Sequence, residues 1–211
     1  MSGVTSDAAS APAKRPIGRP RHFDDEAERR LILDAAYAVL RDRRTELTIS
    51  AVLSGAGIST RAFYRHFESK DALLGAMYLH DAHRMHARVT ARLAVTASPG
   101  DAVIAWIDEI YAMARNPRRA ERVAMLGHIP IDDTDVMRAV AAEGIDLLHA
   151  PLRAALRAGI ETGAFTTSAP DAAAELIAAA TLHAVDLTPP TRGTVIDQAI
   201  TTAFCLAALN P

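Results

Sequence analysis

The chain has 211 residues, of which 50% are hydrophobic, and its formal net charge is −2. This length and composition allow one or two domains with buried cores, and the weak net charge argues against a nonspecific coat on nucleic acid. No stretch reaches the roughly 18–20 apolar residues of a membrane helix, and the N-terminus lacks the long apolar core of a signal peptide. We therefore expect no membrane partner.

The cysteine count indicates a cellular compartment, and the charges are distributed unevenly along the chain. The single cysteine, Cys205, excludes an intramolecular disulfide and fits a reducing cytoplasm, where we expect the protein to reside. Residues 1–80 hold 12 Lys+Arg against 10 Asp+Glu, whereas residues 81–211 hold 11 against 15. The N-terminal part is therefore better suited than the rest to an anionic partner, although this mild contrast alone decides nothing.

The first 21 residues are rich in Ala, Ser, Pro and Gly, and they cannot bury enough apolar surface to order themselves. They end in the basic run KRPIGRPR. A flexible basic arm beside a DNA-binding domain can lie in the minor groove, and the expected contacts are Arg19 and Arg21. The alternative is an ordinary solvated tail.

A first helix is predicted to begin behind Asp24, with three acidic residues near its positive end. An apolar residue recurs at every fourth position, which predicts one buried stripe. That stripe comprises Ala27, Leu31, Ala35 and Val39. A small three-helix core is expected to be completed by Leu47, Ile49, Phe67, Leu73 and Leu74.

Residues 48–70, TISAVLSGAGISTRAFYRHFESK, carry the most informative pattern. A hydroxyl stands before each of three predicted helices, at Thr48, Ser59 and Ser69, where it can accept hydrogen bonds from free backbone N–H groups. Gly57 can adopt the left-handed conformation that a tight corner between helices needs. This spacing is typical of a helix-turn-helix, whose second helix enters the major groove.

At these residues the sequence closely resembles the TetR family of bacterial transcriptional regulators, above all in the run AGISTRAFYRHFESKDALL. The match is strong over roughly residues 19–80, and the remainder resembles the family only in length and helical character. The resemblance implies an all-α fold of about nine helices. Residues 1–21 would form the arm, residues 22–75 the helix-turn-helix domain, and residues 76–211 a helical bundle for dimerisation and ligand binding.

The resemblance also implies individual DNA contacts. Positions that contact phosphates in the family correspond to Thr48, Tyr64, His66 and Lys70. The exposed start of the recognition helix carries Ser59, Thr60 and Arg61. Arg61 is the expected base reader, because a guanidinium can pair with both major-groove acceptors of guanine, although a phosphate contact stays possible. The alternative for the whole motif is a helical corner without a nucleic-acid partner.

Beyond the motif, apolar periodicity and breaks predict further helices. Their expected spans are Ser69 to about Ala97, Asp101 to Arg115, Pro117 to about Leu126, Asp132 to about Thr162, Ser168 to about Asp186, and Arg192 to Leu209. His80, His83 and His86 share one sector of the first of these helices. They suit either a solvated face or a transition metal, and we assign neither a metal nor a cofactor.

Two sites are predicted in the second domain. A mainly apolar ligand pocket is expected between its central helices, lined by Trp106, Ile110, Met113, Met125, His128, Leu148, His149 and His183. Because these faces carry few charges, the ligand should be uncharged or weakly polar. A dimer interface is expected on the last two helices, with small or apolar residues at Ala173, Ala180, Ile196, Ile200 and Ala203.

These features predict a homodimeric regulator that binds double-stranded operator DNA and responds to an unidentified small-molecule effector. We expect a repressor that a hydrophobic ligand releases from a palindromic operator. One alternative is an enzyme with its active site in the C-terminal bundle, but no reactive constellation of residues supports it, so we expect no catalytic function. The other is a constitutive DNA-binding module without an effector.

Overall fold

The computed structural model describes residues 25–42, 46–116, 135–185 and 196–210, and this part of the chain is helical without a strand. The all-α expectation is therefore confirmed. The helices are α1 (Asp25–Arg41), α2 (Ile49–Ala56), α3 (Thr60–His66), α4 (Lys70–Leu93), α5 (Pro99–Arg115), α7 (Asp135–Glu161), α8 (Pro170–Val185) and α9 (Gln198–Ala207). The predicted arm and the predicted short helix after Pro117 lie outside the described residues.

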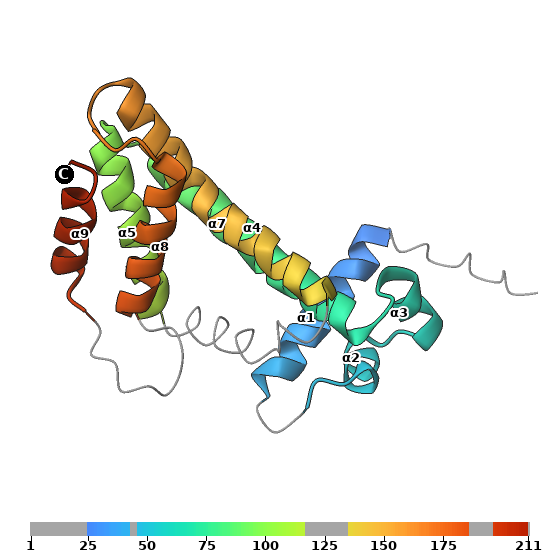
Figure 1. Cartoon of the computed structure of the whole chain (residues 1–211). Helices are drawn as coiled ribbons and strands as arrows, with labels where there is room; N and C mark the ends of the chain where they lie inside the picture. Colours follow the sequence, from blue (N-terminus) through green and yellow to red (C-terminus); the bar gives the residue numbers. More distant parts are fainter. Residues whose placement is uncertain (1–24, 43–45, 117–134, 186–195, 211) are drawn as a thin grey trace, which may run out of the picture.

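Helices α4 and α7 run side by side and join two groups of shorter helices (Figure 1). The group α1–α3 lies at one end, and α5, α8 and α9 lie at the other. Each end has its own hydrophobic core, and α4 takes part in both: Leu73, Leu74 and Met77 belong to the first core, whereas Met85 and Val89 belong to the second. A displacement of α4 would therefore be felt at both ends.

The buried face of α1 differs from the expected stripe. The residues that the helix buries include Glu28, Ile32 and Ala36, whereas the expected Leu31 is 38% exposed. Of the four predicted positions only Ala35 is buried. The spacing of four is correct, but the buried positions start one residue later than expected, with the carboxylate of Glu28 at the first of them.

The ends of α4 and α5 were also misplaced. Helix α4 stops at Leu93, four residues before the expected end, and the Thr96 hydroxyl donates to the Leu93 carbonyl at 2.7 Å, which satisfies that free acceptor outside a helix. Helix α5 begins at Pro99, two residues earlier than expected, behind Ser98, whose Oγ accepts from the Asp101 N–H at 3.1 Å. Proline suits the first turn of a helix because its missing N–H has no helical partner there.

One contact fastens the helix-turn-helix end to α4, and another holds α4 against α7. The Tyr37 hydroxyl of α1 donates to the Met77 carbonyl of α4 at 2.9 Å. The ring of Tyr78 on α4 lies against the backbone of α7 at Gly144, where a Cβ atom would overlap its ring carbon Cε1. Gly144 is thus a position at which the absence of a side chain permits close packing of two helices.

Helix α9 begins at Gln198 rather than near Arg192, because Ile196 and Asp197 are not helical. Asp197 caps the helix by accepting from the Ala199 N–H at 2.8 Å. Cys205 of α9 is buried, as expected for a core residue, and this burial raises the pKa of its thiol above the ordinary value of 9.0. Within the described helices, none combines the length and the apolar character needed to cross a membrane.

Candidate nucleic-acid interface and effector domain

The predicted helix-turn-helix is present with its expected caps. The Thr48 Oγ1 accepts from the Ala51 N–H at 3.1 Å at the start of α2, and the Ser59 Oγ accepts from the Ala62 N–H at 3.2 Å at the start of α3. Between them Gly57 has φ 65° and ψ 32°, the left-handed conformation predicted for it. After this short turn, Ser59, Thr60 and Arg61 at the start of α3 are exposed.

Helix α3 has a buried and an exposed side. Phe63 is fully buried and Phe67, which follows the helix, is 3% exposed, so the expected core roles of both rings are confirmed. The ring of Tyr64 is 51% exposed and stacks edge-on against Phe63, with ring centroids 5.4 Å apart. The exposed polar residues on and before the helix are Ser59, Thr60, Arg61, Tyr64 and Arg65. Such a face can donate to bases and phosphates.

Other residues predicted to contact DNA lie outside α3. Lys70 is half-buried in the first turn of α4, where the Ser69 Oγ accepts from the Ala72 N–H at 3.0 Å. Thr48 is exposed at the start of α2. Arg19 and Arg21 lie outside the described residues.

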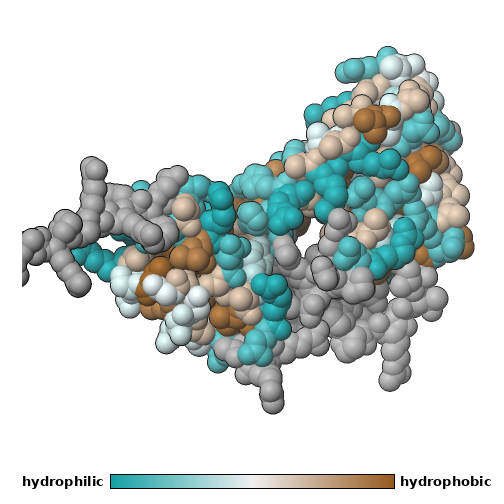
Figure 2. All heavy atoms as spheres, turned by 180° about the vertical axis from the view of Figure 1, so that it is seen from behind, coloured by the Kyte–Doolittle hydropathy of each residue, from teal (hydrophilic) through white to brown (hydrophobic). Residues whose placement is uncertain are grey.

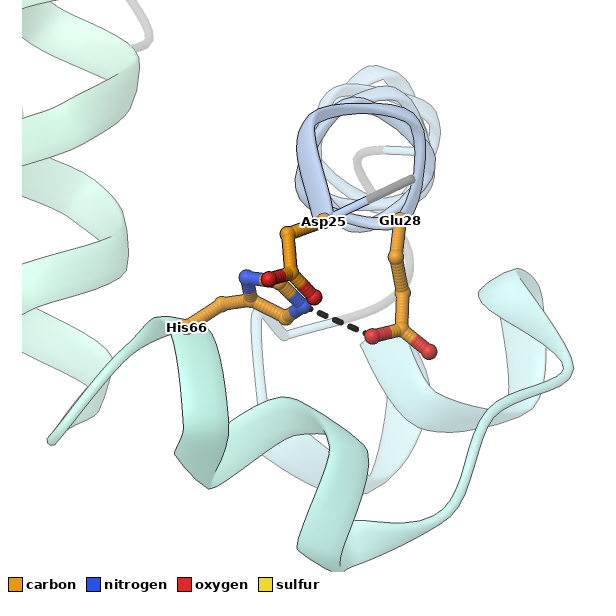
Figure 3. Close-up of side chains that lie close together, drawn as sticks. All are labelled: Asp25, Glu28 and His66. Carbon is orange, nitrogen blue, oxygen red and sulfur yellow. Dashed lines mark hydrogen bonds and ion pairs between the residues drawn. The ribbon is translucent and has the colours of Figure 1, made fainter. Parts of the chain in front are cut away.

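His66 does not join the exposed group. Its side chain is only 7% exposed and points from the end of α3 toward α1, where Nε2 lies 2.7 Å from Glu28 Oε2 (Figure 3). The same carboxylate oxygen accepts from the Arg65 guanidinium. The expected phosphate contact by His66 is therefore not supported by this placement, because the ring nitrogen is already engaged.

Glu28 is the site residue that sequence reasoning missed. Its side chain is 11% exposed, and the hydrogen bond from His66 is the main influence that lowers its pKa below the ordinary 4.5, while burial opposes this shift and Arg65 adds to it. A signal was available, because Glu28, Ile32 and Ala35 lie on one face of a helix with 3.6 residues per turn. A carboxylate on a buried face requires a partner.

The group formed by Asp25, Glu28 and His66 has ligand atoms within 4.8 Å of one another, a separation that a metal ion could bridge. The Arg65 guanidinium already pairs with Glu28 there, so a cation would have to compete with a fixed positive charge. His80, His83 and His86 do not form such a group within the described ranges; the first two are exposed, and His86 Nδ1 lies 2.8 Å from the Leu147 carbonyl oxygen.

The residues predicted for the ligand pocket do not come together around one cavity. Trp106 and Ile110 are fully buried in the second core, and the Trp106 indole N–H donates to the Leu148 carbonyl at 3.0 Å. Met113 and Leu148 pack half-buried against that core. His149 is buried beside Glu175 of α8, with Nδ1 3.0 Å from Oε1, whereas His183 is exposed. Met125 and His128 lie outside the described residues.

Among the described residues of the second domain, three open cavities can be defined, and Trp106 and Ile110 line none of them. One of about 430 Å³ lies between α4, α5 and α7 and is bordered by His86, Thr90 and Pro151. Another of about 340 Å³ borders Tyr111, Val185 and Ile196. Trp106 and Ile110 are thus packed inside the second core and do not face any of these three cavities.

The third cavity, of about 480 Å³, is a groove between α8 and α9. The predicted interface residues Ala173 and Ala180 line it, and Ile200 and Ala203 are exposed on α9. Ile196 does not belong to the α9 stripe, because it precedes the helix and its carbonyl accepts from the Tyr111 hydroxyl at 2.9 Å.

Sequence reasoning also missed Leu176 and Phe204, which are 72% and 66% exposed. Both line the groove between α8 and α9. The signal was the spacing of four that connects Ile200 with Phe204 and Ala172 with Leu176. On the face drawn in Figure 2, hydrophobic side chains lie in several separate places. Among the exposed hydrophobic residues of α8 and α9, Leu176 and Phe204 line the apolar groove, and Ile200 lies one helical turn before Phe204.

Comparison with known proteins places this geometry in context. Residues 32–77 match the family model described as bacterial regulatory proteins, tetR family. The comparison with curated proteins finds no match. Among solved structures, the chain is similar to the reduced form of NemR from E. coli at 23% identity, covering 86% of this chain and 95% of that one with a TM-score of 0.64.

Two further solved structures share the fold. FadR from Bacillus subtilis in complex with stearoyl-CoA is 16% identical, covers 85% of this chain and 96% of its own, and has a TM-score of 0.63. A TetR transcription regulator from Haloarcula marismortui is 20% identical, covers 87% of this chain and 95% of its own, and has a TM-score of 0.63. At these identities the likeness concerns the fold, which spans both ends of the molecule.

Proposed function

We propose that this chain, whose helix-turn-helix matches the model of the TetR family of bacterial regulatory proteins over residues 32–77, is a homodimeric, ligand-responsive repressor that binds a palindromic operator. The observation that carries the proposal is the capped, uncovered α3, which presents Arg61 and Tyr64 to solvent on a rigid three-helix core. Such a regulator would act in the cytoplasm, where its operator lies.

We assign the DNA contacts from their placement. Ser59, Thr60 and Arg61 would read base edges from the exposed start of α3, and Thr48, Tyr64 and Lys70 would contact phosphates on either side. Lys70 is suited to a phosphate because it stands in the first turn of α4, where free N–H groups add partial positive charge. Arg19 and Arg21 would follow the minor groove.

Dimerisation is assigned to α8 and α9. Leu176, Ile200 and Phe204 expose large apolar side chains, and Ala173 and Ala180 line the adjoining groove. A second copy would bury these groups through an isologous contact, in which the same patch is used by both partners. The small residues would allow two helices to approach closely.

The effector is proposed to enter the second core beside Trp106, Ile110 and Met113. FadR from Bacillus subtilis, which shares the fold, is described in complex with stearoyl-CoA, and this supports a hydrophobic ligand within such a domain. Because Trp106 is fully packed here, the effector would have to displace core side chains. It would act only by preferring a dimer with altered spacing of the α3 helices, and α4 is the physical connection.

DNA binding is tested by selecting duplexes from a random pool with the purified full chain and measuring affinity for the enriched sequence by fluorescence anisotropy. We expect an inverted repeat that binds at least a thousandfold more tightly than a scrambled duplex, roughly the lower end for specific regulators. Failure to enrich any sequence at moderate salt would contradict the proposal.

The effector part has its own test, because Trp106 is the only tryptophan in the sequence. A compound that raises the melting temperature of the protein, changes the Trp106 emission and releases the selected duplex would support it. The matched control is a compound that stabilises the protein without changing the emission. Release of DNA by effectors that leave Trp106 emission unchanged would move the ligand site elsewhere, and lack of release by any ligand would favour a constitutive DNA-binding module.

A further inference from the structure

The recognition helix α3 is too short to hold its own orientation. It has seven residues, and helices of this length are not stable in isolation, so packing must fix its direction. Phe63 anchors its inner face in the first core. Phe67, which directly follows the helix, is also buried in this core, and polar contacts at the same end of α3 add a second attachment.

That second attachment comes from the first turn of α1. Glu28 Oε2 accepts from the Arg65 guanidinium and lies 2.7 Å from His66 Nε2. Asp25 adds an ion pair to Arg65 Nε at 3.9 Å, and the Arg29 guanidinium lies over the Phe67 ring, 5.2 Å from its centre. Asp25, Glu28 and Arg29 of α1 thus contact Arg65, His66 and Phe67 at the end of α3. Figure 3 shows the Glu28–His66 pair among these contacts.

Burial decides which of these contacts matters. The side chains of Glu28 and His66 are 11% and 7% exposed, whereas those of Asp25 and Arg65 are 77% and 55% exposed. Exposed ion pairs contribute little to stability. A buried carboxylate is no longer hydrated, so it needs hydrogen-bond donors from the protein. Since an ionised carboxylate only accepts, His66 must donate from Nε2, which fixes the protonated nitrogen of the ring.

We propose that Glu28 is a positioning residue for sequence-specific DNA recognition, acting through His66 and Arg65 on the direction of α3. Arg61 and Arg65 lie four residues apart on one face of the helix, so restraining the Arg65 end also sets where Arg61 points. Base readout needs this alignment far more than phosphate contact does, because only base-edge hydrogen bonds carry sequence information.

This proposal rests on the proposed DNA-binding function and assigns Glu28 no contact with DNA. It differs from a purely repulsive role, in which a carboxylate near the interface would weaken binding to every duplex equally. It also differs from a structural role alone, in which removal of Glu28 would lower the folded fraction without changing the sequence preference of the molecules that remain folded.

The test compares Glu28→Ala and Glu28→Gln with wild type on the duplex that wild type selects and on its scrambled counterpart. Affinity is measured by anisotropy per active molecule, after titration of the active fraction, and circular dichroism confirms helix content at the measuring temperature. We expect Glu28→Ala to lower affinity for the selected duplex roughly tenfold or more while changing the scrambled duplex less than about twofold. Glu28→Gln, which keeps an oxygen acceptor, should be intermediate.

Glu26→Gln is the matched control. It removes the same charge from the same turn of α1, but Glu26 is 66% exposed and faces Arg30 at 3.5 Å rather than α3. We expect the ratio of selected to scrambled affinity to be that of wild type. In a double-mutant cycle, Glu28→Ala and His66→Ala together should lose less than the product of their separate losses, because both remove one contact.

The outcomes separate this inference from the function on which it rests. If wild type enriches no duplex, both fail. If wild type enriches a duplex but the folded Glu28 variants keep its sequence preference, only the positioning role fails. Should Glu28→Ala not fold, Glu28→Gln decides by the same ratio. A rise in affinity for both duplexes by the same factor would also overturn the inference and show simple repulsion.

Discussion

At the scale of single residues, Arg61 and Tyr64 differ in what they offer to DNA. Both are exposed on α3, but a guanidinium can form two hydrogen bonds with one guanine edge, whereas a phenol offers one hydroxyl on an aromatic ring stacked against Phe63. Their substitution should therefore produce different patterns of loss, even though they are less than one helical turn apart.

We predict that Arg61→Ala costs about 1–3 kcal/mol on the selected duplex and relaxes the preference at one position of each half-site. Tyr64→Phe should instead weaken binding to the selected and scrambled duplexes by similar factors, because a phosphate contact is independent of sequence. Competition anisotropy with single-base variants of the duplex measures both. Equal losses on both duplexes for Arg61→Ala would refute base reading.

Glu28 also gives a prediction about stability and pH. Hydrogen bonding lowers its pKa in the folded protein below the ordinary 4.5, so the folded state binds the proton less readily than the unfolded chain. Its contribution is therefore present above pH 4.5 and is lost as the pH falls through the folded pKa. The difference in unfolding free energy between wild type and Glu28→Gln should shrink on acidification.

Urea unfolding of both proteins over an acidic pH series measures this difference, with Glu26→Gln as the exposed control. A difference that stays constant, or grows, below pH 4.5 would show that the carboxylate charge of Glu28 does not stabilise the fold.

The roles of single residues could be predicted from the sequence where they depend on neighbouring residues in the chain. The caps at Thr48, Ser59 and Ser69 and the left-handed Gly57 could be predicted because each depends on its own few neighbours. The role of Glu28 could not be predicted in full, because its partners are 37 and 38 residues away in sequence. Only the buried face of α1 could have shown that it needed any partner.

At the scale of helices, Pro151 explains one contact between α4 and α7. Proline has no N–H, so the Leu147 carbonyl four residues earlier loses its usual helical donor. The His86 ring of α4 supplies one instead, with Nδ1 2.8 Å from that oxygen. A side chain of the helix that leads to the DNA-binding end thus replaces a backbone bond in the helix beside it.

We predict that His86→Leu destabilises the protein by about 1–3 kcal/mol, the usual cost of leaving such a carbonyl without a donor. In a Pro151→Ala background the same substitution should cost clearly less, because the backbone N–H of the introduced alanine would again donate to the Leu147 carbonyl. Chemical denaturation of wild type, the two single variants and the double variant measures both costs. Identical costs in both backgrounds would show that His86 does not compensate for Pro151.

Helix boundaries show where periodicity misleads. The expected start at Asp101 comes after Ser98-Pro99, although serine followed by proline is a favourable helix start, and the expected start near Arg192 comes before the capping residue Asp197. In both cases the correct signal was a capping residue, Ser98 or Asp197. Local capping chemistry located these ends better than the spacing of apolar residues did.

At the scale of the whole molecule, two ends are joined by α4 and α7, and only one end carries a large exposed apolar groove in the part of the chain that the structure describes (Figure 1). The fold could be predicted because the helix-turn-helix motif is specific and its neighbours are helical throughout. The effector site could not, because residues such as Trp106 pack into an ordinary core and nothing in their spacing distinguishes a ligand pocket from one.

The exposed groove gives a prediction about assembly. Ile200→Asp places a charge on the apolar face of α9, where the residue is 64% exposed in the single chain and would be buried in the dimer. Sedimentation velocity should show monomers, and affinity for the selected duplex should fall by more than about a hundredfold, since one half-site alone remains. Thr202→Asp, which places the same charge at a half-buried position of the same helix, is the control. An unchanged dimer would place the interface elsewhere.

The footprint of the protein on its selected duplex tests the central claim most directly, because it reports symmetry, spacing and occupancy together. Hydroxyl-radical cleavage should reveal two equivalent protected regions on one face of the DNA, with centres about one turn, roughly 34–36 Å, apart. Arg61→Ala should weaken both regions equally. A single protected region, or two regions that respond differently to Arg61→Ala, would contradict a two-fold dimer that reads DNA with α3.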